Sequence, residues 1–246
     1  GVGSPVDPRR GPSKEDGGVM EVKPGYKLTD VGVIPEEWGT RRLSDVGNVV
    51  RGSSPRPAGD PRYFNGSFMP WLTVAALTNI PESQLEVSET HGCLTKEGAL
   101  QSRTLQPDTL IIANSGATLG VAKILTITCC ANDGIAALLN HTQGDKQFLC
   151  CYLNTQTKRL REAVATGNGQ PNLNTTLIGN IVVPWPPLPE QRAIAAALGD
   201  VDALIASLDQ SIAKKRDLKQ AAMQQLLTGQ TRLPGFGAPA RLGDKP

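Results

Sequence analysis

The chain has 246 residues, of which 39% are apolar and 4% aromatic, and its formal net charge is +2. This length allows one large domain with an appendage or two small domains. The near-neutral charge excludes binding to nucleic acid through bulk charge, so such contacts need local patches. No apolar run of about 18 residues is present, which excludes a membrane-spanning helix. The first residues lack the apolar core of a secretion signal, so we expect a cytoplasmic protein with no membrane partner.

Residues 1–20 are rich in glycine, proline and charge and are predicted to be a disordered N-terminal extension. Residues 21–187 are predicted to form one domain of short strands and a few helices. Runs of β-branched residues between turn residues predict strands at 68–74, 109–113, 121–130, 135–139 and 180–183. Apolar residues at helical spacing predict helices at 146–165 and 95–102. Because these elements do not alternate regularly, the fold class is predicted to be α+β with a mixed sheet.

Four of the five cysteines form the adjacent pairs Cys129-Cys130 and Cys150-Cys151, inside apolar runs. No CxxC spacing occurs, so the sequence indicates neither a zinc site nor a disulfide framework. Cysteines in apolar runs are usually buried. We therefore expect buried free thiols in a reducing compartment.

The segment 188–228 is predicted to contain one helix of about 38 residues, about 57 Å long. Three prolines, Pro186, Pro187 and Pro189, hold its start extended, and proline is tolerated in a first helical turn. Gly229 provides a stop, and residues 229–246 form a C-terminal tail. A helix of this length exceeds what one compact core can cover, so it needs a helical partner or acts as a spacer.

The apolar positions of this helix follow steps of 4, 3, 4, 3 and 4, which is the seam of a coiled coil. After Ile212, the apolar positions shift by one residue relative to this spacing. The seam comprises Ile194, Leu198, Val201, Ile205, Leu208 and Ile212, followed by Leu218, Ala222 and Leu226. Acidic residues (Asp200, Asp202, Asp209) occupy the first half of the helix and basic residues (Lys214, Lys215, Arg216, Lys219) the second. Two antiparallel copies would set acid against base at both ends. The alternative is a helix that packs on its own domain.

Catalytic motifs are missing from the sequence. It has no nucleophile elbow, no phosphate-binding P-loop and only two histidines, His91 and His141, which we expect on loops or at strand ends. Pro107-Asp108 could open a nuclease metal site, but Lys123, the candidate lysine, lacks the acidic neighbour that such a site requires. We therefore predict no catalytic residue, no metal and no cofactor.

Polar loops are better candidates for function. Residues 51–56 carry two arginines and two serines on a flexible turn, which suits phosphate groups. Residues 167–174 read GNGQPNLN, and amide side chains match the donor and acceptor of an adenine edge. Residues 114–120 form a further tight connection. The predicted DNA contacts are Arg51, Ser53, Ser54, Arg56, Asn114, Ser115, Gln170, Asn172 and Asn174. The alternative for each loop is an ordinary surface turn.

Several longer motifs resemble one family. They are YKLTDVGVIPEEWGTRRLSDVG near the start, then MPWLTVAAL, LTKEGALQSRTLQPDTLIIANSGATLGVAKI, NDGIAALL and GNGQPNLN, and finally IVVPWPPLPEQRAIAAALGDVDALI with LKQAAMQQLLTGQTRLPGF. Together they resemble the specificity (S) subunit of type I restriction-modification systems. The resemblance covers roughly residues 26–236.

The resemblance implies a DNA-binding subunit without catalysis of its own. In that family, two target recognition domains each read one half of a split DNA site. Two long antiparallel helices separate the domains and dock methyltransferase (M) subunits. Restriction (R) subunits then join the complex and cleave DNA. Residues 21–187 would be one target recognition domain and residues 188–228 one spacer helix.

The chain carries one such domain and one such helix, so it resembles a half subunit. We expect two copies to pair antiparallel through the long helix and to read a symmetric, interrupted site. Complementation of another S fragment is the alternative pairing. Two other functions stay open: an assembly protein that docks M subunits without reading bases, and a self-contained nuclease or methyltransferase. The bases recognised and the base methylated do not follow from the sequence.

Overall fold

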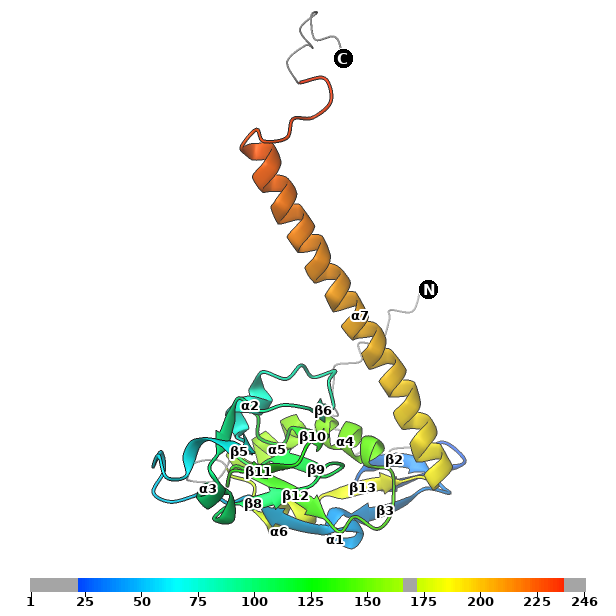
Figure 1. The fold of residues 1–246 in the computed structure, drawn as a ribbon. Helices are drawn as coiled ribbons and strands as arrows, with labels where there is room; N and C mark the ends of the chain where they lie inside the picture. The colour runs from blue at the N-terminus through cyan, green and yellow to red at the C-terminus, as the bar shows by residue number, and fades with distance from the viewer. Residues whose placement is uncertain (1–21, 166–171, 237–246) are drawn as a thin grey trace, which may run out of the picture.

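The structure is a computed structural model that describes residues 22–165 and 172–236 (Figure 1). The described residues up to Pro187 form a globular head, and one long helix, α7 (Leu188–Leu227), projects from it. The head combines mixed sheets with short helices. The predicted α+β class with a long C-terminal helix is therefore confirmed.

A five-stranded sheet forms the centre of the head. Its strands in spatial order are β4 (Asn48–Arg51), β12 (Ile135–Leu139), β9 (Leu110–Ala113), β10 (Ala122–Leu125) and β6 (Glu86–Val87). β6 pairs with β10 in parallel, and the other pairs are antiparallel. The central strands read LIIA, AKIL and IAALL, and nearly all their residues are buried. Such continuous burial is expected of strands covered on both faces.

A second sheet of four strands covers one face of the first. Its strands in spatial order are β7 (Gly92–Leu94), β5 (Phe64–Leu72), β11 (Cys129–Ala131) and β8 (Arg103–Leu105). The single strand predicted over 121–130 is wrong, because β10 and β11 lie in different sheets. The chain leaves β10 after Leu125, where Thr126 bonds to Val87 through its main-chain N–H at 3.0 Å. Both halves of the segment 121–130 are apolar, so the sequence pattern does not show where the chain passes from one sheet to the other.

Two apolar clusters hold these layers together. Alternate residues of β9 and β12 face opposite sides: Ile112 and Leu138 pack in one cluster, Ile111 and Ala137 in the other. The first cluster lies against helices α1 (Leu43–Val46), α4 (Lys146–Thr155) and α6 (Thr175–Gly179). The second lies against β5 and β11. The head is thus a helix layer, a central sheet and a second sheet, with two short helices, α2 (Val74–Thr78) and α3 (Lys96–Leu100), at its edge.

The helix predicted over 146–165 is two helices, α4 and α5 (Thr157–Ala165), with Gln156 between them. Side chains compete with the helical backbone at this point. Thr155 Oγ1 donates to the Tyr152 carbonyl at 2.6 Å, and Thr157 Oγ1 donates to the Asn154 carbonyl at 3.0 Å. Such local hydroxyl–carbonyl bonds disfavour an uninterrupted helix.

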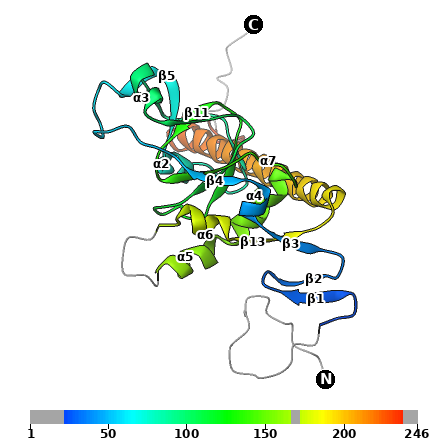
Figure 2. The same ribbon diagram turned by 90° about the horizontal axis from the view of Figure 1, so that it is seen from below.

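Two smaller strand pairs lie outside the main sheets. β1 (Tyr26–Thr29) and β2 (Gly32–Pro35) form a hairpin at the periphery of the head (Figure 2). β3 (Gly39–Arg42) pairs with β13 (Val182–Trp185), which carries Pro184 in a two-stranded sheet that leaves one edge free. β13 leads directly into α7. Among the described residues, no helix is both long enough and apolar enough to cross a membrane.

The first two turns of α7 anchor the helix to the head. Gln191 is 1% exposed, and its amide donates to the Pro186 carbonyl at 2.8 Å while its carbonyl accepts from the Asp145 N–H at 2.8 Å. Trp38 Nε1 donates to Glu190 at 3.0 Å. Ala195 is buried, and Ile194 packs against the core. These contacts orient the rod relative to the head.

The five cysteines are free, and Cys129, Cys130 and Cys150 are buried as predicted, whereas Cys151 is only half-buried. Burial raises the pKa of Cys129 and of Cys150 to about 12. At pH 8 such a thiol is thiolate in only about one molecule in 10⁴, and the thiolate is the reactive form. We predict that iodoacetamide leaves Cys129 and Cys150 unlabelled in native protein and labels both in guanidinium, as measured by peptide mass spectrometry. Half-buried Cys93 is the internal control and should label natively; equal labelling of all three would contradict the buried core.

Candidate nucleic-acid interface

The loop 51–56 leaves β4 and runs against the turn formed by Asn132, Asp133 and Gly134. Gly52 donates its N–H to the Ile135 carbonyl at 2.8 Å, and Ser53 donates its N–H to the Ala131 carbonyl at 2.9 Å. A side chain at Gly52 would meet the Asn132 carbonyl oxygen at 2.1 Å. The close approach of two backbones therefore requires glycine here.

Asp133 connects most of the predicted contact residues. Its carboxylate accepts from Ser54 Oγ at 2.7 Å and from Arg56 at 3.4 Å. Its main-chain carbonyl accepts from Arg51 Nε and from Asn114 Nδ2. Reasoning from the sequence missed Asp133. The available signal was an Asn-Asp-Gly turn directly before a buried strand, since such turns carry functional side chains.

Arg103, at the start of β8, is a second residue that the sequence analysis missed. Its Nε donates to the Arg51 carbonyl at 2.8 Å. Beside it, Ser53 Oγ donates to the Gln101 carbonyl at 3.2 Å. The side chains of Arg51, Arg56 and Arg103 are exposed. Arg56 contacts the Asp133 carboxylate, Arg51 the Asp133 main-chain carbonyl, and Arg103 the Arg51 carbonyl. Three exposed arginines are thus linked through one turn that carries a single carboxylate.

The loop 114–120 joins the same network. Asn114 is 2% exposed, donates its N–H to the Gly134 carbonyl at 2.9 Å and accepts from the Leu173 N–H at 2.8 Å. Ser115 and Asn172 form an antiparallel bridge. Within the described part of the chain, Asn114 Oδ1 has no hydrogen-bond partner. Asn114 thus supports the loops from inside, whereas Ser115 and Asn172 lie nearer the surface.

The side chain of Asn174 bonds within α6 rather than to this network. Asn174 caps α6, where its Oδ1 accepts from the Leu177 N–H at 2.8 Å. That bond uses one of the two acceptor positions of Oδ1, and the side chain is exposed. Gln170 lies outside the described residues.

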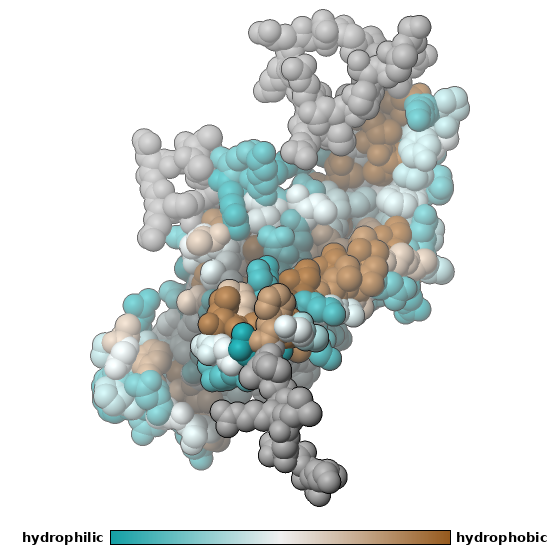
Figure 3. Space-filling model, turned by 90° about the horizontal axis from the view of Figure 1, so that it is seen from above, coloured by the Kyte–Doolittle hydropathy of each residue, from teal (hydrophilic) through white to brown (hydrophobic). Residues whose placement is uncertain are grey.

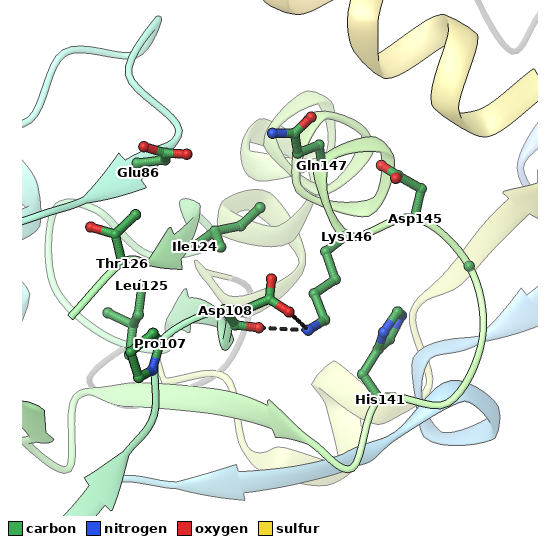
Figure 4. Close-up of a pocket in the computed structure, with 11 residues that line it drawn as sticks. Glu86, Pro107, Asp108, Ile124, Leu125, Thr126, His141, Asp145, Lys146 and Gln147 are labelled. Carbon is green, nitrogen blue, oxygen red and sulfur yellow. Dashed lines mark hydrogen bonds and ion pairs between the residues drawn. The ribbon is translucent and has the colours of Figure 1, made fainter. Parts of the chain in front are cut away.

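Asp108 and Lys123, which the rejected nuclease motif would combine, bond to different partners. Figure 4 shows a pocket of about 550 Å³ in which Lys146 pairs with Asp108, beside His141. Lys123 is 1% exposed and donates instead to the Pro81 carbonyl at 2.8 Å and to the Gln84 carbonyl. Burial lowers the pKa of Lys123 and that of His141. Over residues 22–165 and 172–236, no group of three His, Cys, Asp or Glu side chains could hold a metal ion.

The long helix presents an uncovered apolar stripe. Leu198, Val201, Ile205, Leu208 and Ile212 are between 43% and 54% exposed. Farther along, Leu218 is 55% and Leu226 42% exposed. Apolar side chains form a strip along this helix in the space-filling view (Figure 3). Ile194 differs from the other seam residues because it is half-buried and packs on the head.

Residues 35–214 match the family model of the type I restriction modification DNA specificity domain. This match covers most of the chain. The chain belongs to the type I specificity-domain family. This specificity domain is 25% identical over 182 residues to the type I restriction enzyme MjaIX specificity subunit of Methanocaldococcus jannaschii, covering 73% of this chain and 41% of the relative. It is also 26% identical over 229 residues to the MjaVIII specificity subunit of the same organism, covering 88% and 51%.

Solved structures share the fold of this specificity domain. The HsdS subunit from Thermoanaerobacter tengcongensis superposes with a TM-score of 0.56 at 23% identity, over 78% of this chain and 45% of that chain. A second solved structure comes from work on the complex assembly and conformational transition of the type I restriction-modification system. It gives a TM-score of 0.59 at 22% identity, over 78% of this chain and 46% of that chain. The chain therefore spans about half the length of these proteins.

Proposed function

We propose that the head of this specificity domain binds one half of a split DNA site and has no catalytic activity of its own. The observation that carries the proposal is the convergence of Arg51, Ser54, Arg56 and Asn114 on the turn at Asp133. Arginines and hydroxyl groups suit phosphates, and nearby amides suit base edges. Family membership and the specificity-subunit names of the relatives support it.

Methyltransferase and restriction subunits are the proposed protein partners. One solved structural relative comes from work on the complex assembly of the type I restriction-modification system. A specificity domain without chemistry of its own needs such partners to modify or cleave DNA. Double-stranded DNA and these subunits are therefore the expected ligands, and no cofactor is proposed for this chain.

A second copy of the chain is the proposed partner of α7. Beyond Ala195, every residue of this helix except Asp202 is exposed, so the apolar stripe lacks cover from the head. In an antiparallel pair, the acidic first half of one helix lies beside the basic second half of the other. Each exposed charge pair contributes only about 0.2–1 kcal/mol. Charge therefore selects the orientation, and the stripe supplies the affinity.

Salt dependence of DNA affinity tests the proposed function. The DNA sequence is unknown, but phosphate contacts do not depend on sequence, so a random-sequence duplex is a sufficient probe. Replacing Arg51 and Arg56 together by alanine is expected to weaken binding and to reduce the slope of log K against log salt by about 2. Fluorescence anisotropy at several salt concentrations measures both quantities.

Arg41→Ala is the matched control, because Arg41 is exposed on β3, away from the loop 51–56. It should leave affinity and slope unchanged. A flat salt response of the wild-type protein would instead favour an assembly role without DNA contact. DNA cleavage with magnesium, or methylation with S-adenosylmethionine, by the purified chain would establish an enzyme.

A further inference from the structure

The two carboxylate oxygens of Asp133 have different bonding roles. Oδ1 accepts from Ser54 Oγ at 2.7 Å, and the Asp133 N–H donates back to Ser54 Oγ at 3.3 Å. This pair of bonds ties the loop 51–56 to the turn. Oδ2 contacts Arg56 at 3.4 Å. One oxygen is thus structural, and the other only holds a cation.

The Arg56–Asp133 pair is easily separated. Its N–O distance is 3.4 Å, and the two side chains are 72% and 41% exposed. Exposed pairs of this kind contribute little, because water screens them and a long side chain must be held in place. A phosphate offers Arg56 a stronger partner, since guanidinium and phosphate form paired, charge-assisted hydrogen bonds.

Arg103 adds a cation to the same place. Its Nε is held at 2.8 Å by the Arg51 carbonyl, which fixes the guanidinium beside the end of β4. Among the described residues, no carboxylate lies within ion-pair distance of Arg103. It is therefore available to a phosphate without breaking an ion pair.

From these contacts we propose that Asp133 is an internal competitor of DNA phosphate. It holds Arg56 in the free protein and yields it when a phosphate binds, while Arg103 acts as a further phosphate contact. This inference rests on the proposed function and extends it. The negative charge of Asp133 lowers affinity for any duplex, so weak phosphate binding alone does not hold the domain on DNA. Base contacts then contribute a larger share of total affinity, which favours selective binding.

The variant Asp133→Asn tests the competitor role. Asparagine keeps a carbonyl oxygen for Ser54 and removes the charge. Binding to a random-sequence duplex at low salt is expected to tighten roughly 2- to 5-fold, and the gain should shrink as salt rises. Asp133→Glu keeps the charge and should bind like the wild type. Asp108→Asn is the matched control, because it also removes one exposed carboxylate, from the Lys146 pair, and should change nothing.

Two further variants test whether Asp133 acts through Arg56 and whether Arg103 contacts phosphate. If Asp133 acts through Arg56, the gain from Asp133→Asn should disappear in an Arg56→Ala background. Arg103→Ala should weaken binding and reduce the salt slope by about 0.9. Thermal melting checks that each variant is folded.

The outcomes separate this inference from the proposed function. If the Arg51 and Arg56 variant loses affinity but Asp133→Asn binds no more tightly, the DNA-binding function stands and the competitor role is wrong. An Arg103→Ala variant that binds like the wild type would remove Arg103 from the site. A wild-type chain with no affinity for DNA at any salt concentration would overturn both proposals.

Discussion

Replacing both Val201 and Ile205 by aspartate is expected to convert a dimer of this chain into a monomer, with the measured mass falling to 26.1 kDa. The two side chains are 54% and 43% exposed in the single chain and lie on the apolar stripe of α7. In a helix pair they would be buried. Burying an unpaired carboxylate costs several kcal/mol, and two-fold symmetry applies that cost to both copies. Size-exclusion chromatography with light scattering measures the mass.

The opposite face of the same helix offers a matched control. Gln210 and Ala213 are exposed and lie away from the seam. Replacing both by aspartate adds the same charge to the same helix, so the protein should stay dimeric. A dimer that survives the Val201 and Ile205 substitutions would place the contact elsewhere. A wild-type chain of monomeric mass would remove the proposed self-pairing and leave another helix as the partner of the stripe.

Gly52→Ala is expected to produce the largest loss of stability from a single methyl group. The added carbon would meet the Asn132 carbonyl oxygen at 2.1 Å and the Ala131 carbonyl oxygen at 2.6 Å. Both obstacles are backbone carbonyl oxygens, which cannot rotate away as a side chain could. Overpacking of this kind costs about 3 kcal/mol. The melting temperature should fall by roughly 6–12 °C, and DNA affinity should fall with it because the turn carries Asp133.

Gly199→Ala is the control for this substitution. Nothing lies within 4 Å of the carbon that alanine would add at Gly199, which is a helical position of α7. Alanine favours a helix over glycine by about 1 kcal/mol, so thermal stability should not fall. Equal melting temperatures for Gly52→Ala and the wild type, measured by differential scanning fluorimetry, would contradict the close packing of the two backbones.

Local signals predicted the parts of the fold that depend on neighbouring residues. The prolines before Leu188, the heptad spacing from Ile194 to Ile212 and the stop at Gly229 lie within α7 or directly beside its ends. The strand prediction over 121–130 failed because it depended on pairing between distant strands. Both of its halves are apolar, and only pairing with β9 and with β5 distinguishes them.

The candidate DNA site shows the same division. Glycine, serine and arginine in the loop 51–56 indicated phosphate chemistry, because those residue types suit it wherever they are placed. Asp133 and Arg103 were missed because their partners lie far away along the chain, and no spacing rule links them to Arg51 or Arg56. β4 pairs with β12, and β8 pairs with β11. This pairing brings Asp133 and Arg103 close to the loop 51–56.

The amino-acid sequence alone therefore determined the family, the mixed α+β class and the long apolar-striped helix, since each depends on short-range pattern or on motifs along the chain. Only the tertiary structure decided which loops meet, which asparagine is a buried support and which carboxylate holds Arg56. It also decided that α7 leaves the head after Ala195. Those properties depend on contacts between distant segments, and such contacts form only when buried strands pair.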